Sequence, residues 1–243
     1  MAPPGDMTPE LLVLEPAPYG HGREWLLHLA AYARRCEPVP RLAFAVAPPV
    51  AEALRRELAL APVPGLSIHA LTEREVAGCT QPKLALSALA RWQVMRRLLR
   101  RTGARHGFFL ELDHLSLPLA LGLPLGGGRS VSGILFRPSV HYETAARRAG
   151  DARREARKNL LYRAMLRHRA VARVHTLDDA FPDFARTRYR DGGKVTALVD
   201  PAFPPVAPTV ADRALAERAP EDRALFALFG VLSERKGVLA LLR

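Results

Sequence analysis

Short apolar runs alternate along the chain with segments of helical spacing, and this alternation restricts the possible folds more than any other feature. We expect strands at Leu11 to Leu14, Leu42 to Val46, Leu66 to Ala70, Gly107 to His114, Val131 to Phe136, Val171 to Asp178, Lys194 to Val199 and Leu225 to Phe229. The last run is apolar at every position, which suits a parallel strand covered on both faces. The alternation predicts an α/β fold with an open parallel sheet.

Segments of helical spacing fill the gaps between these runs. We expect helices at Trp25 to Ala33, Val50 to Leu60, Pro82 to Thr102, Leu115 to Leu121, Ala145 to Val171, and from Asp179 onward. The clearest is Pro82 to Thr102, because proline suits a first helical position and Gly103 suits the cap. Its expected buried stripe is Leu84, Ala88, Trp92, Met95 and Leu99. For Ala145 to Val171 the expected stripe is Ala152, Ala156, Leu160, Ala164 and Met165.

The composition is globular and disfavours several classes of protein. No apolar run approaches the roughly 20 residues that a membrane span needs. The segment Met1 to Glu10 lacks the basic and apolar regions of a signal peptide. Cys36 and Cys79 have no metal-ligand spacing and suggest no disulfide framework. A cytoplasmic location fits these features best, and we expect no metal.

The formal net charge of the 243 residues is +12, which suggests a polyanionic partner. The expected helix at Ala145 to Val171 concentrates arginines away from its apolar stripe. An anionic bilayer would suit it, since each cation near such a surface contributes about 1 kcal/mol; nucleic acid is the other candidate. A solvated helix in an arginine-biased protein explains the same pattern.

Polar and glycine residues follow two of the expected strands. Tyr19-Gly20-His21-Gly22 comes between the first strand and its helix, a geometry that can cradle a phosphate or a sugar ring. Asp113 and His114 end a later strand, and such ends line the ligand crevice of doubly wound sheets. They would hold acceptor hydroxyls or act on a proton; alternatively, Asp113 only caps the next helix.

The stretch from Ala224 to Val238 reads as a buried strand, a turn and the first turns of a helix. Gly230 allows a tight turn, and Gly237 allows a close approach. Arg235 and Lys236 precede an apolar segment, and two cations near a helix N-terminus after a parallel strand make a phosphate site. An ordinary strand, loop and helix with solvated charges is the alternative.

Part of this stretch has the sequence Phe-Gly-Val-Leu-Ser-Glu-Arg-Lys-Gly-Val. It closely resembles the start of the nucleotide-sugar-binding domain in retaining glycosyltransferases of the GT-B fold, the sucrose-synthase-like family. That family reads F-G-R-L-S-x-R-K-G there. The resemblance implies that Lys236, helped by Arg235, contacts the diphosphate of a sugar nucleotide. It further implies a Rossmann-like first domain whose first βα loop, with Gly20 and Gly22, faces the cleft between domains.

The chain departs from the family at three points. Val231 stands where the family often has arginine, and Arg137 stands about where many members have a histidine that contacts the transferred sugar. Arg137 would instead bind an anionic sugar or a phosphate. The family's E-x-x-x-x-x-x-x-E donor motif should lie downstream of Arg243, so we expect a truncated enzyme that is nearly inactive by itself. The expected domains are residues 1–203 on the acceptor side, a linker at 204–223, and the start of the donor domain at 224–243.

The resemblance therefore implies a hexosyl-type transferase that moves a sugar from a nucleotide diphosphate sugar to an acceptor, which is a glycan, a lipid or a small molecule. Its expected catalytic residues are Asp113, His114 and Arg137, and its expected donor-binding residues are Gly20, Gly22, Gly230, Arg235 and Lys236. No cofactor is expected, because cations and helix N-termini can stabilise the leaving diphosphate. Peripheral contact with the inner membrane face fits the basic helix. The alternative is a non-catalytic basic module that binds an anionic membrane or nucleic acid.

Overall fold

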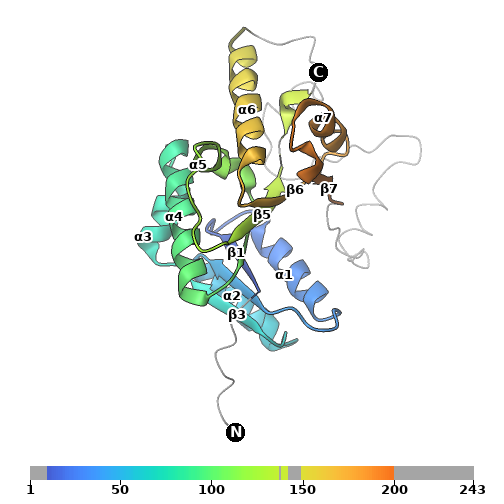
Figure 1. Ribbon diagram of the computed structural model, residues 1–243. Helices are drawn as coiled ribbons and strands as arrows, with labels where there is room; N and C mark the ends of the chain where they lie inside the picture. Colours follow the sequence, from blue (N-terminus) through green and yellow to red (C-terminus); the bar gives the residue numbers. More distant parts are fainter. Residues whose placement is uncertain (1–9, 137, 142–148, 200–243) are drawn as a thin grey trace, which may run out of the picture. The chain divides into compact units, whose positions relative to one another are not determined.

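The computed structural model describes residues 10–136, 138–141 and 149–199, which form one parallel sheet with helices around it (Figure 1). The strands are β1 (Leu11–Glu15), β2 (Leu42–Val46), β3 (Leu66–Ala70), β4 (His106–Phe109), β5 (Ser130–Leu135), β6 (Val171–Thr176) and β7 (Val195–Ala197). Every pairing between them is parallel. The predicted α/β class with an open parallel sheet is thus confirmed.

The strand order is β3-β2-β1-β4-β5-β6-β7. From β1 the chain winds outward through β2 to β3, then returns to place β4 on the other side of β1. This order is Rossmann-like, and it puts a topological switch point between β1 and β4. In open sheets of this kind, ligands bind outside the carboxyl ends of the strands at that point.

The helices are α1 (Gly22–Ala33), α2 (Pro48–Ala59), α3 (Glu73–Thr80), α4 (Leu84–Thr102), α5 (Ser116–Ala120), α6 (Ala149–Arg167) and α7 (Phe181–Arg188). Because strand side chains alternate between the two faces of a sheet, β1 and β2 contribute residues to two hydrophobic cores. Val13 and Phe44 pack with α1 and α2, while Leu12 and Leu14 pack with α4, α5 and α6. Figure 1 shows α3, α4 and α5 on one side of the strands and α1 on the other.

Several element boundaries differ from the prediction, among them those of β4 and α4. The strand expected from Gly107 to His114 ends at Phe109, and Leu112–Leu115 forms a 3₁₀ turn. Helix α4 begins at Leu84, so Pro82 precedes the helix and is not its first residue. Gly103 does cap α4, with φ at 74°, a left-handed conformation that glycine adopts without strain.

Two predictions about the helices fail in whole or in part. Of the stripe expected for α6, Met165 is buried, but Ala152, Ala156 and Leu160 are exposed, and Tyr162 and Leu166 are buried instead. The long side chains cover more apolar surface than the alanines do. Helix α3 was not expected, although Thr72 and Glu75 form a capping box at its start, and T-x-x-E is a readable signal.

Arg137 and residues 200–243 lie outside the described residues. The predicted linker at 204–223, the start of the donor domain at 224–243, and the site residues Gly230, Arg235 and Lys236 fall there. The expected strand before them is present as β7, over the shorter range Val195–Ala197.

Candidate functional site

A cleft opens at the switch point, beyond the carboxyl ends of β1 and β4. Its cavity measures about 590 Å³, within the roughly 300 to 1,000 Å³ that small-molecule sites occupy. Residues after three strands line it together with side chains of α1 and α6: Glu15, Gly20, Gly22, Trp25, Glu111, Asp113, His114, Phe136, Lys158 and Tyr162 are among them. The cleft is therefore where the topology rule places a ligand.

The loop after β1 forms one wall of the cleft around the Glu15 carboxyl. The Ala17 N–H donates to Glu15 Oε1 at 2.9 Å. A Cβ on Gly22 would lie 2.6 Å from Glu15 Cγ and 2.9 Å from Cδ. Any other residue at position 22 would therefore clash with the Glu15 side chain in this conformation. Gly20 has φ at 96°, which a residue with a Cβ adopts only with strain. Both glycines have steric roles in shaping the cleft.

Glu15 is a buried carboxyl at the edge of this cavity. Only 3% of the residue is exposed. Burial raises the pKa of Glu15 from its ordinary 4.5 to about 7; the Ala17 N–H lowers it, the charge of Glu111 raises it further, and Arg91 lowers it slightly. Because removal from water dominates, the group exchanges its proton near neutral pH. Perturbed carboxyls in clefts are candidates for functional groups.

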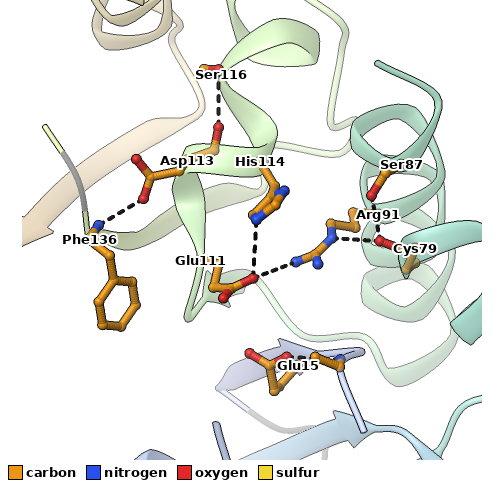
Figure 2. A network of polar contacts seen from close by, with 10 residues as sticks. Glu15, Cys79, Ser87, Arg91, Glu111, Asp113, His114, Ser116 and Phe136 are labelled. Carbon is orange, nitrogen blue, oxygen red and sulfur yellow. Dashed lines mark hydrogen bonds and ion pairs between the residues drawn. The ribbon is translucent and has the colours of Figure 1, made fainter. Parts of the chain in front are cut away.

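Glu111, which follows β4, lines the cleft and contacts a buried arginine of α4 (Figure 2). Its Oε2 lies 3.5 Å from Arg91 Nη1 and 3.3 Å from His114 Nε2. Arg91 is only 5% exposed, and its Nε–H donates to the Cys79 carbonyl at 3.0 Å. Arg91 is thus a fixed cation that holds Glu111, and Glu111 in turn orients the His114 ring.

Asp113 links two strand ends to α6. Its Oδ2 accepts the Phe136 N–H at 2.8 Å, and its Oδ1 accepts the Tyr162 hydroxyl at 3.0 Å. Burial, and then the charge of Asp113, raise the pKa of Tyr162, which keeps this hydroxyl protonated as a donor. The alternative that Asp113 caps the following helix is not what the contacts show, because both oxygens bond elsewhere.

Aromatic side chains complete the cleft. The rings of Trp25 and Phe136 meet edge to face, with centroids 6.1 Å apart. Lys158 Nζ lies 5.6 Å from the centroid of the Tyr162 ring and donates to Ser139 Oγ at 3.0 Å. The cleft thus combines apolar ring surface with carboxyl, imidazole and ammonium groups, as sites for small polar molecules do.

A second cavity of about 480 Å³ adjoins the first and shares Phe136 and Lys158 with it. Ser139 lines it and donates to the Glu155 carboxylate at 3.1 Å. Asp178 lines it as well, with Oδ2 lying 3.2 Å from His141 Nε2. Helix α6 therefore borders both cavities, and Lys158 lines each of them.

The structure brings four of the predicted site residues together: Gly20, Gly22, Asp113 and His114 all line the cleft. The other four, Arg137, Gly230, Arg235 and Lys236, lie outside the described residues. The sequence did not point to Glu15, Glu111, Trp25 and Tyr162 as cleft residues, nor to Arg91 as the cation that contacts Glu111. Glu15 and Glu111 had a readable signal, because each is a carboxylate at or just after an apolar strand.

Within residues 10–136, 138–141 and 149–199, no group of three or more histidine, cysteine, aspartate or glutamate side chains is arranged to hold a metal ion. No helix in those same ranges is both long and apolar enough to cross a membrane.

Comparison with known proteins returned no relatives: no protein-family model, no curated protein and no solved structure matches this chain.

Proposed function

We propose that this chain is the acceptor-side part of a glycosyltransferase, and that the switch-point cleft binds the acceptor of a sugar carried by a nucleotide diphosphate. Two features support this proposal. The Rossmann-like sheet has a ligand-sized cleft at the expected edge, and residues 224–238 resemble the opening of a nucleotide-sugar-binding domain. Neither feature alone would distinguish a transferase from another ligand-binding protein.

The observation that carries the proposal is the Arg91–Glu111–His114 chain at the cleft wall. A histidine held by a carboxylate is the usual arrangement of a general base, because the carboxylate stabilises the imidazolium that forms. Glu111 Oε2 lies 3.3 Å from His114 Nε2, and His114 lines the cavity. Asp113 acts here as a positioning residue, since both of its oxygens hold other parts of the protein.

In the proposed reaction, an acceptor hydroxyl attacks the anomeric carbon of the donor sugar. The hydroxyl proton passes to His114, the new C–O bond forms, and the bond to the diphosphate breaks so that the diphosphate leaves with the electron pair. Lys236 and Arg235 would stabilise the charge on that leaving group. Gly20 and Gly22 would let the acceptor approach the β1 loop closely.

The test is transfer from a panel of radiolabelled nucleotide diphosphate sugars, in a protein that carries these 243 residues together with a complete donor domain. We expect His114→Ala to lower kcat by about a hundredfold or more, with a smaller change in KM, since general-base catalysis contributes on that scale. We expect Lys236→Ala to weaken binding of the nucleoside diphosphate, measured by calorimetry, by about tenfold or more.

The matched control is His28→Ala, a histidine of α1 that does not line the cleft. It should leave kcat unchanged. Full transfer by His114→Ala would remove the proposed base, and unchanged diphosphate affinity in Lys236→Ala would remove the proposed donor site. If no sugar nucleotide in the panel binds at all, the proposed function fails.

One observation favours a second candidate, a basic module that docks on an anionic membrane. The side chains of Arg153, Arg157, Arg163 and Arg167 are exposed along α6, while Tyr162 of the same helix is buried. Each cation near an anionic bilayer contributes about 1 kcal/mol. Sedimentation with phosphatidylserine vesicles at rising salt tests this: binding lost in an Arg153→Gln, Arg157→Gln double variant would support docking, and binding unaffected by salt would exclude it.

A further inference from the structure

Glu15 is the most deeply buried carboxyl that lines the cleft, and the proposed reaction leaves it without a role. It is 3% exposed and borders the cavity at the end of β1. Its Oε1 accepts the Ala17 N–H, while no hydrogen bond from any described residue reaches Oε2. Oε2 is not among the fully buried, unbonded side-chain atoms of the described residues, so it is open to the cavity that Glu15 lines and can bond a ligand there.

The neighbouring glycine keeps this oxygen in place. A Cβ on Gly22 would lie 3.3 Å from Glu15 Oε2 and 2.6 Å from its Cγ, so a side chain there would push the carboxyl aside. Gly22 lines the same cavity. The β1 loop is therefore shaped so that the carboxyl stays at the floor of the cleft.

The nearby cation is engaged elsewhere. Arg91 donates to the Cys79 carbonyl and lies 3.5 Å from Glu111, and its effect on the pKa of Glu15 is the weakest of those that act on it. Figure 2 shows Glu15 across from the Arg91 and Glu111 side chains. Among the described residues Glu15 has no ion-pair partner, and near neutral pH a large part of it is the neutral acid.

The chemistry of the site selects among ligand groups. A neutral carboxyl both donates and accepts hydrogen bonds, and a hydroxyl is the group that matches both roles. In the same cavity the carboxylates of Glu111 and Asp113 would repel a phosphate, and Lys158, the one lysine or arginine among the described lining residues, already donates to Ser139 Oγ. Trp25 and Phe136 add ring surface that suits the apolar face of a sugar.

We propose that Glu15 is a specificity-determining residue that binds a hydroxyl of the acceptor through Oε2, and that the acceptor is an uncharged sugar or polyol. This inference rests on the proposed function, because it names the substrate class of the same cleft. Glu111 accepts a hydrogen bond from a second hydroxyl, and the ring of the acceptor packs against Trp25.

The experiment follows the fluorescence of Trp25 while glucose, mannose, galactose, glucitol or glucose 6-phosphate is added to the 243-residue protein at about pH 6. Trp92, the chain's other tryptophan, is buried in the core and supplies a constant background. A Trp25→Phe variant defines that background. Circular dichroism of each variant checks that it folds.

Two substitutions of Glu15 separate hydrogen bonding from packing. We expect Glu15→Met, which keeps the bulk without the polar atoms, to weaken binding of the uncharged ligand by about tenfold or more. Glu15→Gln keeps an acceptor for Ala17 and a donor for the hydroxyl, so its affinity should stay within about threefold. The matched control is Glu52→Met, on the exposed face of α2 and outside the cleft.

Equal affinities of wild type and Glu15→Met would overturn the role of Glu15. Tighter binding of glucose 6-phosphate than of the uncharged sugars would overturn the ligand class. The failure of this inference is distinct from the failure of the proposed function. Uncharged sugars that bind through Glu15, with no sugar nucleotide serving as donor, would leave the inference standing alone. Transfer that proceeds only to anionic acceptors, without dependence on Glu15, would leave only the function standing.

Discussion

The polar side chains at the two ends of the parallel sheet differ in what they contact. At the amino ends of the strands, polar side chains bond within the protein. His168, before β6, accepts the Ala170 N–H at Nδ1, and its Nε2 lies 3.1 Å from the Leu123 carbonyl. At the carboxyl ends, Glu15 and His114 border the cleft of about 590 Å³. His168 also borders a cavity, one of about 320 Å³, but both of its ring nitrogens contact groups of the protein. Both sets of groups lie on the same scaffold of strands.

Further contacts at the amino ends follow the same rule. His106 Nδ1 lies 2.6 Å from Ser130 Oγ across β4 and β5, and Lys194 Nζ donates to the Leu166 carbonyl at 2.8 Å. Burial lowers the pKa of His106, which therefore stays neutral within this network. The polar groups named at the amino ends thus bond within the protein, whereas the carboxyl ends place polar side chains along the cleft. Substitutions at the two ends should accordingly differ in what they change.

The largest effect on stability is expected at Gly192, before β7. A Cβ there would lie 1.9 Å from the Ala185 carbonyl oxygen and 2.3 Å from its carbon, both backbone atoms that cannot move aside. Gly192→Ala should therefore lower the free energy of unfolding by roughly 4 kcal/mol, above the usual range for overpacking. Urea denaturation measures this change.

Gly193→Ala is the matched control, because its added Cβ would meet nothing within 4 Å. It should change the free energy of unfolding by less than about 0.5 kcal/mol. Equal stability of the two variants would mean that the amino end is less tightly packed than these contacts indicate.

At the carboxyl end, Glu15→Gln should change how stability depends on pH. In the unfolded chain Glu15 loses its proton near pH 4.5, but in the folded protein only near pH 7. Wild-type stability should therefore fall as pH rises through this window, by about 3 kcal/mol at about 1.4 kcal/mol per pKa unit. Glutamine has no proton to lose, so the variant should exceed the wild type in stability at about pH 8 and match it near pH 4.

Denaturation at both pH values checks this prediction, with Glu52→Gln on the exposed face of α2 as the control. The control should follow the wild type throughout. A Glu15→Gln variant that loses stability in parallel with the wild type would show that the buried carboxyl does not hold its proton, and the contrast between the sheet ends would weaken.

The sequence predicted the sheet well because buried parallel strands leave a direct record in apolar runs. Leu42–Val46 and Leu66–Ala70 were predicted at the bounds that the structure shows. The expectation that strand ends carry function located Asp113 and His114 in the cleft. These successes depend on local patterns, which a single chain displays.

The remaining parts of the cleft depend on contacts between distant segments. Arg91 looks like one arginine among many on α4, and its burial follows from the placement of Glu111 by strand order. The role of Gly22 depends on how the β1 loop folds over Glu15. Strand order and loop path are tertiary facts, so propensity and periodicity carry no signal for them.

A smaller effect is expected for two tyrosine hydroxyls, of which only that of Tyr162 belongs to a residue that lines the cleft. Tyr162 donates to the Asp113 carboxylate, and Tyr189 donates to the side-chain oxygen of Asn159 at 2.6 Å. Tyr162→Phe leaves a carboxylate oxygen without its donor and should cost about 2 kcal/mol, whereas Tyr189→Phe loses a neutral hydrogen bond and should cost about 1 kcal/mol. Only Tyr162→Phe should also weaken ligand binding in the cleft. Urea denaturation and Trp25 fluorescence test both claims, and a ligand affinity reduced equally in both variants would contradict the separate role of the cleft residue.

The smallest effect concerns His168 at the amino end. Burial, and then the nearby charges of Arg169 and Lys194, lower the pKa of His168, although its contact with the Leu123 carbonyl opposes this. Unfolded histidine takes up a proton at a higher pH than the folded residue does. The stabilising contribution of neutral His168 is therefore fully present above about pH 6.5 and is lost as pH falls below it.

His168→Asn keeps an acceptor for the Ala170 N–H and loses only the Leu123 contact. It should be about 1 kcal/mol less stable than the wild type at about pH 8, and this gap should close at about pH 5, where the wild type has lost its advantage. Denaturation at the two pH values tests this prediction. A stability difference between variant and wild type that stays constant with pH would mean that the contribution of His168 does not depend on its neutral form.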